Sequence, residues 1–166
     1  MQICQVYHLF YPASIGGVET QISQVSKFLS GYDPHLHFNL ITDRIYSLSF
    51  LHKDMSKLGY YDGLKVFRLG PNFLRIISNF SEVVQVKSGL RNAPHWKKLR
   101  EIAAKRLFEE AKKIKDIKET DVFHLHGMWK ENLEYELLAS LLSKFFEKPL
   151  IVHLQGTYHL GPESMP

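Results

Sequence analysis

Three short stretches of the chain carry residues whose types and spacing could do chemistry. "SIGGVE" places Gly16 and Gly17 before an amphipathic segment, "HLHGMW" holds His124 and His126, and "LIVHLQG" ends an apolar run at His153. A glycine pair ahead of a helix leaves backbone N–H groups at the positive end of the helix dipole, which attracts phosphate or another anion. Alternatively, the two glycines only permit a tight turn with positive φ.

The histidines allow two kinds of chemistry. Imidazoles can ligate a metal, but no cysteine or carboxylate motif completes a tetrahedral set with His124 and His126, so we expect no metal. We expect instead that His124 is a buried structural residue and that His126 faces a cleft. A histidine such as His153, at the end of a parallel strand, can hydrogen-bond or exchange protons with a ligand, or be satisfied by a neighbouring carbonyl.

Several common catalytic fingerprints are absent from the sequence. It contains no G-x-G-x-x-G or P-loop pattern, no G-x-S-x-G elbow and no D-x-D triplet. Dinucleotide binding, ATP binding of the P-loop type and serine hydrolase chemistry are therefore not indicated.

Size and composition fit a single domain over residues 1–166. The chain is 45% hydrophobic and 23% charged, enough for one substantial core. A net charge of +4 with a pI of about 9.1 is a small excess, so we expect no nucleic-acid partner. The single cysteine, Cys4, is expected to be a small buried hydrophobe. The start of the chain does not resemble a secretory signal and no apolar run could cross a membrane, which predicts a cytoplasmic location.

Alternating strands and helices must position the candidate residues. Hydrophobic periodicity predicts strands over 2–9, 35–42, 64–70, 121–127 and 148–156, and helices over 17–30, 94–117 and 131–146. Strands joined by helical crossovers pair in parallel, so we expect a doubly wound, Rossmann-like α/β sheet of about five strands in the order 3-2-1-4-5, with helices on both faces. Ligands of such sheets sit at the carboxyl ends of the strands, where all three stretches arrive.

Some segments are harder to interpret. Residues 43–63 show no clean period, and the apolar residues 71–94 could cover the sheet as a short helix or form a binding loop. On the first helix, we expect one buried face: Val18, Ile22, Val25 and Leu29. The segment 96–118 carries nine Lys and Arg against four acids, so this helix could contact a membrane peripherally by docking on anionic lipid, or simply present a solvated face.

Taken together, "FYPASIGGVE", "DVFHLHG" and "LIVHLQG" resemble, in order and approximate spacing, the amino-terminal domain of glycosyltransferase family 4. Members of that family are retaining, nucleotide-sugar-dependent enzymes of the GT-B architecture, in which two Rossmann-like domains enclose the active site. The resemblance covers residues 2 to about 156. It implies a nucleotide diphosphate sugar as the donor, a glycan or lipid-linked acceptor, and no metal or other cofactor.

The resemblance also implies roles for individual residues. Gly16 and Gly17 match a loop that approaches the donor phosphates and the acceptor, with Glu19 capping the helix that follows. His153 matches the active-site histidine that contacts the donor sugar.

His126 and Gly127 match a second corner of the cleft, where they would meet the acceptor. A GT-B enzyme also needs a carboxyl-terminal domain, which supplies most of the donor binding. We therefore expect residues 1–166 to be the acceptor-side half of an enzyme and to be inactive alone. Two alternatives stay open: a nucleotide-sugar 2-epimerase half-domain on the same architecture, and a non-catalytic domain that binds a glycan or a partner protein.

Overall fold

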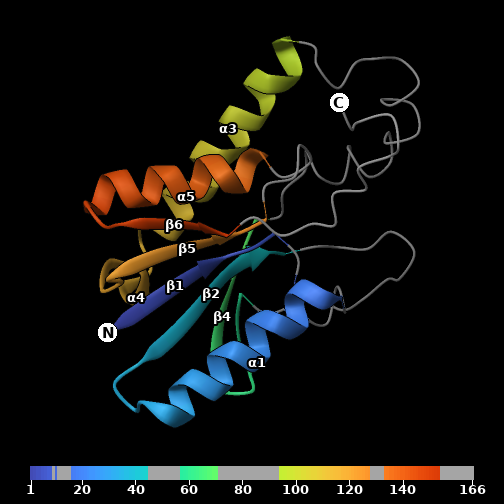
Figure 1. Cartoon of the computed structure of the whole chain (residues 1–166). Coiled ribbons are helices and arrows are strands. Elements are labelled where there is room, and N and C mark those ends of the chain that lie inside the picture. Colours follow the sequence, from blue (N-terminus) through green and yellow to red (C-terminus); the bar gives the residue numbers. More distant parts are fainter. Residues whose placement is uncertain (9, 11–15, 45–56, 71–93, 128–132, 154–166) are drawn as a thin grey trace, which may run out of the picture.

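A six-stranded, mostly parallel sheet forms the centre of the molecule (Figure 1). The computed structural model describes residues 1–8, 10, 16–44, 57–70, 94–127 and 133–153. The strands are β1 (Gln2–Val6), β2 (His37–Asp43), β3 (Leu58–Tyr61), β4 (Leu64–Leu69), β5 (Val122–His126) and β6 (Leu150–His153). Their order is β3-β4-β2-β1-β5-β6, and every pair is parallel except β3 with β4.

The sheet confirms the predicted α/β fold class. The five parallel strands lie in the predicted order, with the first strand of the chain in the interior of the sheet. The added strand, β3, falls within residues 43–63, where the sequence predicted no element. It forms a hairpin with β4 through Asp62 and Gly63, which have φ values of 48° and 83°. Two positive φ values in a two-residue turn match the right-handed twist of the strands that it joins.

Helices cover both faces of the sheet (Figure 1). They are α1 (Gly17–Tyr32) on one face, and α3 (Pro94–Ala111), α4 (Lys115–Lys118) and α5 (Leu133–Phe146) on the other. Ile22 of α1 packs with Leu40 and Val66 of the sheet in one core cluster. A larger cluster on the opposite face includes Phe123 of β5 and Leu142 of α5. Cys4 is buried in this larger cluster, as expected for a small hydrophobe, and burial raises the pKa of its thiol.

Most of the predicted buried face of α1 is confirmed, because Ile22 is buried and Val18 and Leu29 pack partly buried against the same core cluster, but Val25 does not. Val25 is 45% exposed, whereas Ile22 is 1% exposed and Ser23 and Ser26 are buried. The physical reason is a polar partner on the sheet: the side-chain amide of Gln5 donates to Ser26 Oγ over 2.5 Å. A buried amide needs such a bond, so α1 presents serines to the sheet where an apolar pattern would present valine.

The helix predicted over 94–117 is two helices. The first ends at Ala111, and the chain is extended at Ile114, with φ −77° and ψ 122°, before α4 begins. Leu107 and Ala111 are buried, whereas Leu99 is 38% exposed. The apolar segment 71–93, for which two interpretations were open, lies outside the described residues.

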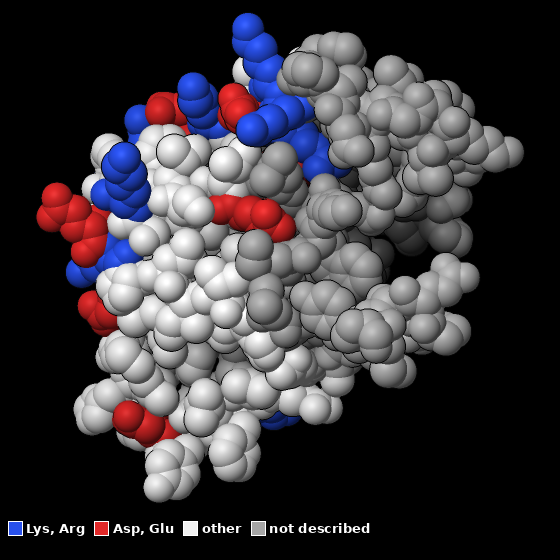
Figure 2. Space-filling model, turned by 45° about the horizontal axis from the view of Figure 1, so that its top comes forward, with Lys and Arg blue, Asp and Glu red and all other residues white. Residues whose placement is uncertain are grey.

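The basic surface predicted for this part of the chain is interrupted. Arg100 is buried, with its Nε 4.0 Å from Glu134 Oε2, and Lys112 pairs with Glu109 at 2.7 Å. Figure 2 shows basic and acidic side chains interspersed on the face that it presents. These contacts favour a solvated face over lipid docking. In the part of the chain that the structure describes, no helix has the length and apolar character needed to cross a bilayer.

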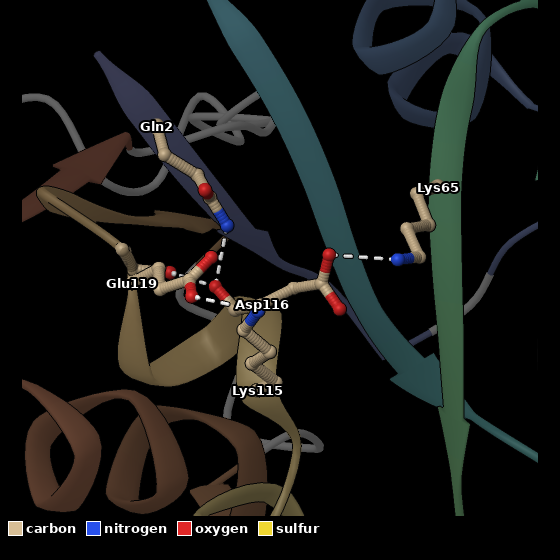
Figure 3. Close-up of polar contacts among 6 residues, drawn as sticks. Gln2, Lys65, Lys115, Asp116 and Glu119 are labelled. Carbon is tan, nitrogen blue, oxygen red and sulfur yellow. Dashed lines mark hydrogen bonds and ion pairs between the residues drawn. The ribbon is translucent and has the colours of Figure 1, made fainter.

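The short helix α4 is held at the amino ends of the strands by Asp116 (Figure 3). Its carboxylate accepts a 2.7 Å hydrogen bond from Lys65 Nζ on β4, and its backbone carbonyl accepts one from the side-chain amide of Gln2 on β1. The hydrogen bond to Asp116 raises the pKa of Lys65. One aspartate therefore ties α4 to two strands of the sheet.

Candidate functional site

The predicted site residues gather at the carboxyl edge of the sheet. The first turn of α1 and the ends of β5 and β6 lie along this edge (Figure 1). In the register of β5 and β6, His126 is the direct partner of His153. The fold therefore places the glycine corner, defined as Gly16 and Gly17, and both predicted histidines where doubly wound sheets bind ligands.

Backbone conformation tests one of the two interpretations of the glycines. Gly16 is the N-cap of α1 with φ −143° and ψ −174°, and neither Gly16 nor Gly17 has positive φ. The tight-turn interpretation is therefore wrong. A Cβ on Gly16 would lie 2.7 Å from Glu19 Oε2, whereas a Cβ on Gly17 would meet no atom of the described residues within 4 Å. Gly16 is small because Glu19 packs beside it, and Gly17 leaves open space at the start of the helix.

The start of α1 offers backbone donors. The first hydrogen bond of the helix runs from Thr20 N to Gly16 O over 3.1 Å, so the amides of Gly17, Val18 and Glu19 precede it. Such amides carry the positive end of the helix dipole. Glu19 is buried, and within the described residues no side-chain hydrogen bond caps α1 at Gly16. Glu19 therefore packs beside the glycine corner, and its capping of the helix, which the resemblance implies, stays a prediction.

Three histidines form a cluster at the carboxyl ends of β5 and β6. His124, His126 and His153, here called the histidine cluster, lie on one face of β5 and β6. The ring centroids of His124 and His126 are 4.1 Å apart, and that of His153 lies 5.9 and 5.7 Å from them. Alternate residues of a strand share a face, and direct partners on neighbouring strands share it too. The strand register thus brings together residues from two distant parts of the sequence.

Gln5 links the histidine cluster to α1. His126 is 5% exposed, and its Nε2 lies 2.7 Å from Oε1 of the buried Gln5, whose amide nitrogen bonds Ser26. An amide oxygen only accepts, so His126 Nε2 is the donor and its Nδ1 is the basic nitrogen. His124 is only half-buried. His126 is therefore buried where the sequence predicted a cleft-facing side chain, because the central strand β1 supplies its partner, and His124 is less buried than predicted.

The surroundings of His124 and His126 disfavour protonation of these two rings. Burial, together with the neighbouring His124 and His153, lowers the pKa of His126 from 6.5 to about 3. Burial and the proximity of His153 also lower the pKa of His124. Both rings are neutral at pH 7, so each keeps a nitrogen lone pair for a hydrogen bond, a proton or a metal ion.

Gly127 fixes the end of β5. Its φ of 80° lies in the left-handed region, and its N–H donates to the carbonyl of His153 over 2.9 Å. Only glycine adopts this conformation without strain. The turn thereby holds the ends of β5 and β6 together and sets the positions of His126 and His153. Contact of Gly127 with an acceptor stays a prediction.

Sequence analysis missed one member of the site, Gln5, and the grouping of His153 with His124 and His126. Gln5 was read as part of an apolar strand, although a polar amide inside a central strand signals a buried hydrogen bond. The grouping of His153 with His124 and His126 follows from the predicted strand order, which makes their strands neighbours. The strand order brings the imidazole of His153 next to those of His124 and His126, although the sequence around "HLHG" itself contains only two histidines.

A hollow lies at the opposite, amino-terminal edge of the sheet. It encloses about 530 Å³ and is lined in part by Asn39, Tyr60, Lys65 and Asp116. The Nδ2 of Asn39 is buried there with no hydrogen-bond partner among the described residues. Ligand sites of doubly wound sheets lie at the carboxyl edge, so this hollow is not the candidate site.

Comparison with known proteins does not place the chain in a family. No family model matches it, and no curated protein matches it. Two similar solved structures are crystal structures of the C-terminal domain of PF1911 hydrogenase from Pyrococcus furiosus, covering residues 78–226 and 83–215. Their sequence identities are 14% and 13%, each with a TM-score of 0.42 over 92% of this chain and 90% of that chain. At this identity and TM-score, the likeness carries no argument about function.

Proposed function

We propose that this chain is the acceptor-side, amino-terminal domain of a retaining glycosyltransferase of the GT-B architecture. The enzyme transfers a sugar from a nucleotide diphosphate sugar to a glycan or a lipid-linked acceptor. The motifs "FYPASIGGVE", "DVFHLHG" and "LIVHLQG" motivate the proposal. The observation that carries it is the open space at Gly17, where the helix α1 begins at the carboxyl edge. A phosphate can approach the helix end closely only where no side chain stands in the way.

The mechanism gives the glycine corner an electrostatic task. In retaining transfer, negative charge builds on the departing phosphate as the bond to the sugar breaks. The amides of Gly17, Val18 and Glu19 precede the first hydrogen bond of α1 and lie at the positive end of its dipole. Donors fixed before the reaction stabilise this charge without reorganising, which is the largest contribution that such a site makes.

The histidine cluster provides the sugar-binding side of the proposed cleft. His153 is half-buried at the carboxyl end of β6 and contacts the donor sugar in this proposal. Its backbone is held by the hydrogen bond from Gly127, and its neighbour His126 is held by Gln5. Positioning of this kind lowers the barrier because the reacting groups are already oriented.

A second domain completes the proposed enzyme. The carboxyl-terminal half of a GT-B enzyme supplies the clamp for the donor pyrophosphate and closes the cleft. Residues 1–166 alone bind nucleotide diphosphate sugars weakly, on the order of millimolar, and transfer no sugar. The proposed setting is the cytoplasm, because the single cysteine forms no internal disulfide.

Transfer of labelled sugar tests this function. The assay compares three proteins: residues 1–166, an intact enzyme that contains them and its His153→Ala variant, with His35→Ala at an exposed site as the control. We expect transfer only by the two-domain proteins, and a turnover about 100-fold lower for His153→Ala, the usual loss for one positioned hydrogen-bonding group. Transfer by residues 1–166 alone would refute the half-enzyme proposal. Conversion of the nucleotide sugar to its C2 epimer, with no transfer, would support the 2-epimerase alternative.

A further inference from the structure

The histidine cluster has the ligand set of a metal site. His124, His126 and His153 each contribute one ring nitrogen, and the three nitrogens lie within 4.8 Å of one another. No other group of this kind occurs in the parts of the chain that the structure describes. Two of these histidines come from β5 and the third from the neighbouring strand β6, so the backbone pairing of the sheet holds all three side by side.

The spacing is close to what a metal ion requires. Zinc–nitrogen bonds of about 2.1 Å in a tetrahedral site place the ligating nitrogens about 3.4 Å apart. The largest separation in the cluster is 4.8 Å, so the nitrogens must close by no more than about 1.4 Å. Rotation of imidazole rings about their broad terminal torsions supplies movements of this size without any change in the strands.

The hydrogen bond from His126 to Gln5 is the outer support that metal-ligating histidines usually have. A ligating imidazole almost always donates its other ring N–H to an acceptor, which fixes the ring and its tautomer. Here Nε2 of His126 donates to Gln5 Oε1 over 2.7 Å, which leaves Nδ1 with the lone pair. The amide of Gln5 is itself fixed by Ser26 on α1, so the support extends across three elements.

The chemistry of the ligands selects the class of ion. Imidazole nitrogen suits zinc, copper, nickel and cobalt, whereas magnesium and calcium take oxygen ligands. Three protein ligands also leave a fourth position for water or another small ligand.

We propose that His124, His126 and His153 bind one divalent transition-metal ion of the zinc type. This site is additional to the proposed sugar transfer, for which the sequence predicts no metal. His153 belongs to both, so a bound ion competes with the donor sugar for it. Direct measurement of metal binding needs no nucleotide sugar, and its result is therefore independent of whether the chain belongs to a glycosyltransferase.

The test is a metal titration of the 166-residue chain after dialysis against EDTA. We expect one Zn²⁺ per chain with a Kd on the order of micromolar. Co²⁺ should give the intense visible bands of a four- or five-coordinate ion, and Mg²⁺ should not bind. Absence of Zn²⁺ binding at ten times this Kd, or weak octahedral-type Co²⁺ bands, would overturn the proposal.

Substitutions locate the ion. His153→Gln removes one ligand from a half-buried position on the edge strand β6. We expect the affinity for Zn²⁺ to fall by at least about 100-fold, because removing a residue that only supports a ligand already costs up to about 100-fold. The matched control is the double variant His35→Gln with His37→Gln, at two exposed histidines with the same spacing as His124 and His126. This control should bind as the unchanged chain does. Binding that survives His153→Gln but is lost in the control would overturn the site.

A measurement without substitutions guards against a variant that fails to fold. Long-range proton–nitrogen NMR spectra of the imidazole rings, recorded with and without Zn²⁺, report which nitrogens bind the ion. We expect large shifts for the nitrogens of the three clustered rings only. Shifts confined to other histidines would contradict the proposal.

Discussion

Replacement of His126 by glutamine should flatten the acid side of the stability profile. The folded chain holds His126 neutral, because burial and two neighbouring histidines lower its pKa from 6.5 to about 3. Between these two pH values, the unfolded chain takes up a proton that the folded chain does not. The contribution of His126 to stability is therefore complete above pH 6.5 and is lost as the pH falls towards 3.

The size of the effect follows from this shift in pKa. Each pH unit within the interval costs up to about 1.4 kcal/mol, so the free energy of unfolding should fall by about 2.5 kcal/mol from about pH 7.5 to about pH 4.5 through this residue. His124, whose pKa is also lowered, acts in the same direction. His126→Gln removes the titrating ring but keeps an N–H donor close to the position of Nε2, so the bond to Gln5 can persist.

Urea unfolding followed by circular dichroism, in EDTA-containing buffers, measures the effect. The difference in unfolding free energy between the unchanged chain and His126→Gln should shift by about 2.5 kcal/mol over that pH range, in favour of the variant at low pH. His35→Gln, at an exposed site, is the control and should follow the unchanged chain. If the difference in unfolding free energy between the two proteins stayed constant with pH, the fold would not be holding His126 neutral.

Two further predictions concern the supports of the site and of the sheet. Gly127→Ala should destabilise the chain by about 1–2 kcal/mol, because φ is 80° at this position. Gly31→Ala is the control and should not destabilise the chain, because an added Cβ there meets no described atom within 4 Å. Equal melting temperatures for the two variants would contradict this prediction. A double-mutant cycle of Lys65→Met and Asp116→Asn should give a coupling of about 0.5–1 kcal/mol, since the 2.7 Å ion pair is about one-third exposed and screened by water. A coupling that does not weaken in high salt would argue against an ionic contact.

The parallel sheet could be predicted because its strands are recognisable in the sequence as short apolar runs. β1, β2, β4, β5 and β6 are apolar runs, most of them separated by helical patterns, and their order is that of a doubly wound sheet whose crossovers pair strands in parallel. The hairpin strand β3 was missed because it is short and largely exposed, so it has no apolar pattern. Its turn did carry a signal, since Asp62-Gly63 is a preferred hairpin dipeptide.

Contacts across elements could not be read from periodicity. The apolar pattern of α1 placed Val25 in the core, but the Gln5–Ser26 hydrogen bond turns a polar face towards the sheet. Likewise, no local pattern joins His153 to His124, because 29 positions separate them and only strand register brings them together. The glycine corner was predicted in place, but its open side at Gly17 depends on the three-dimensional packing of its neighbours.

Titration with a nucleotide diphosphate sugar is the most direct test of the proposal that the glycine corner binds the donor phosphates. The measurement is a proton–nitrogen NMR titration of residues 1–166 and of two variants, Gly17→Ala and Gly31→Ala. Both glycines lie in α1, and an added Cβ meets no described atom within 4 Å at either, so the two variants should fold alike. We predict millimolar binding with shifts at the amides of residues 17–19, an affinity at least about tenfold weaker in Gly17→Ala, and an unchanged affinity in Gly31→Ala. Equal binding by both variants, or shifts that never include residues 17–19, would contradict it.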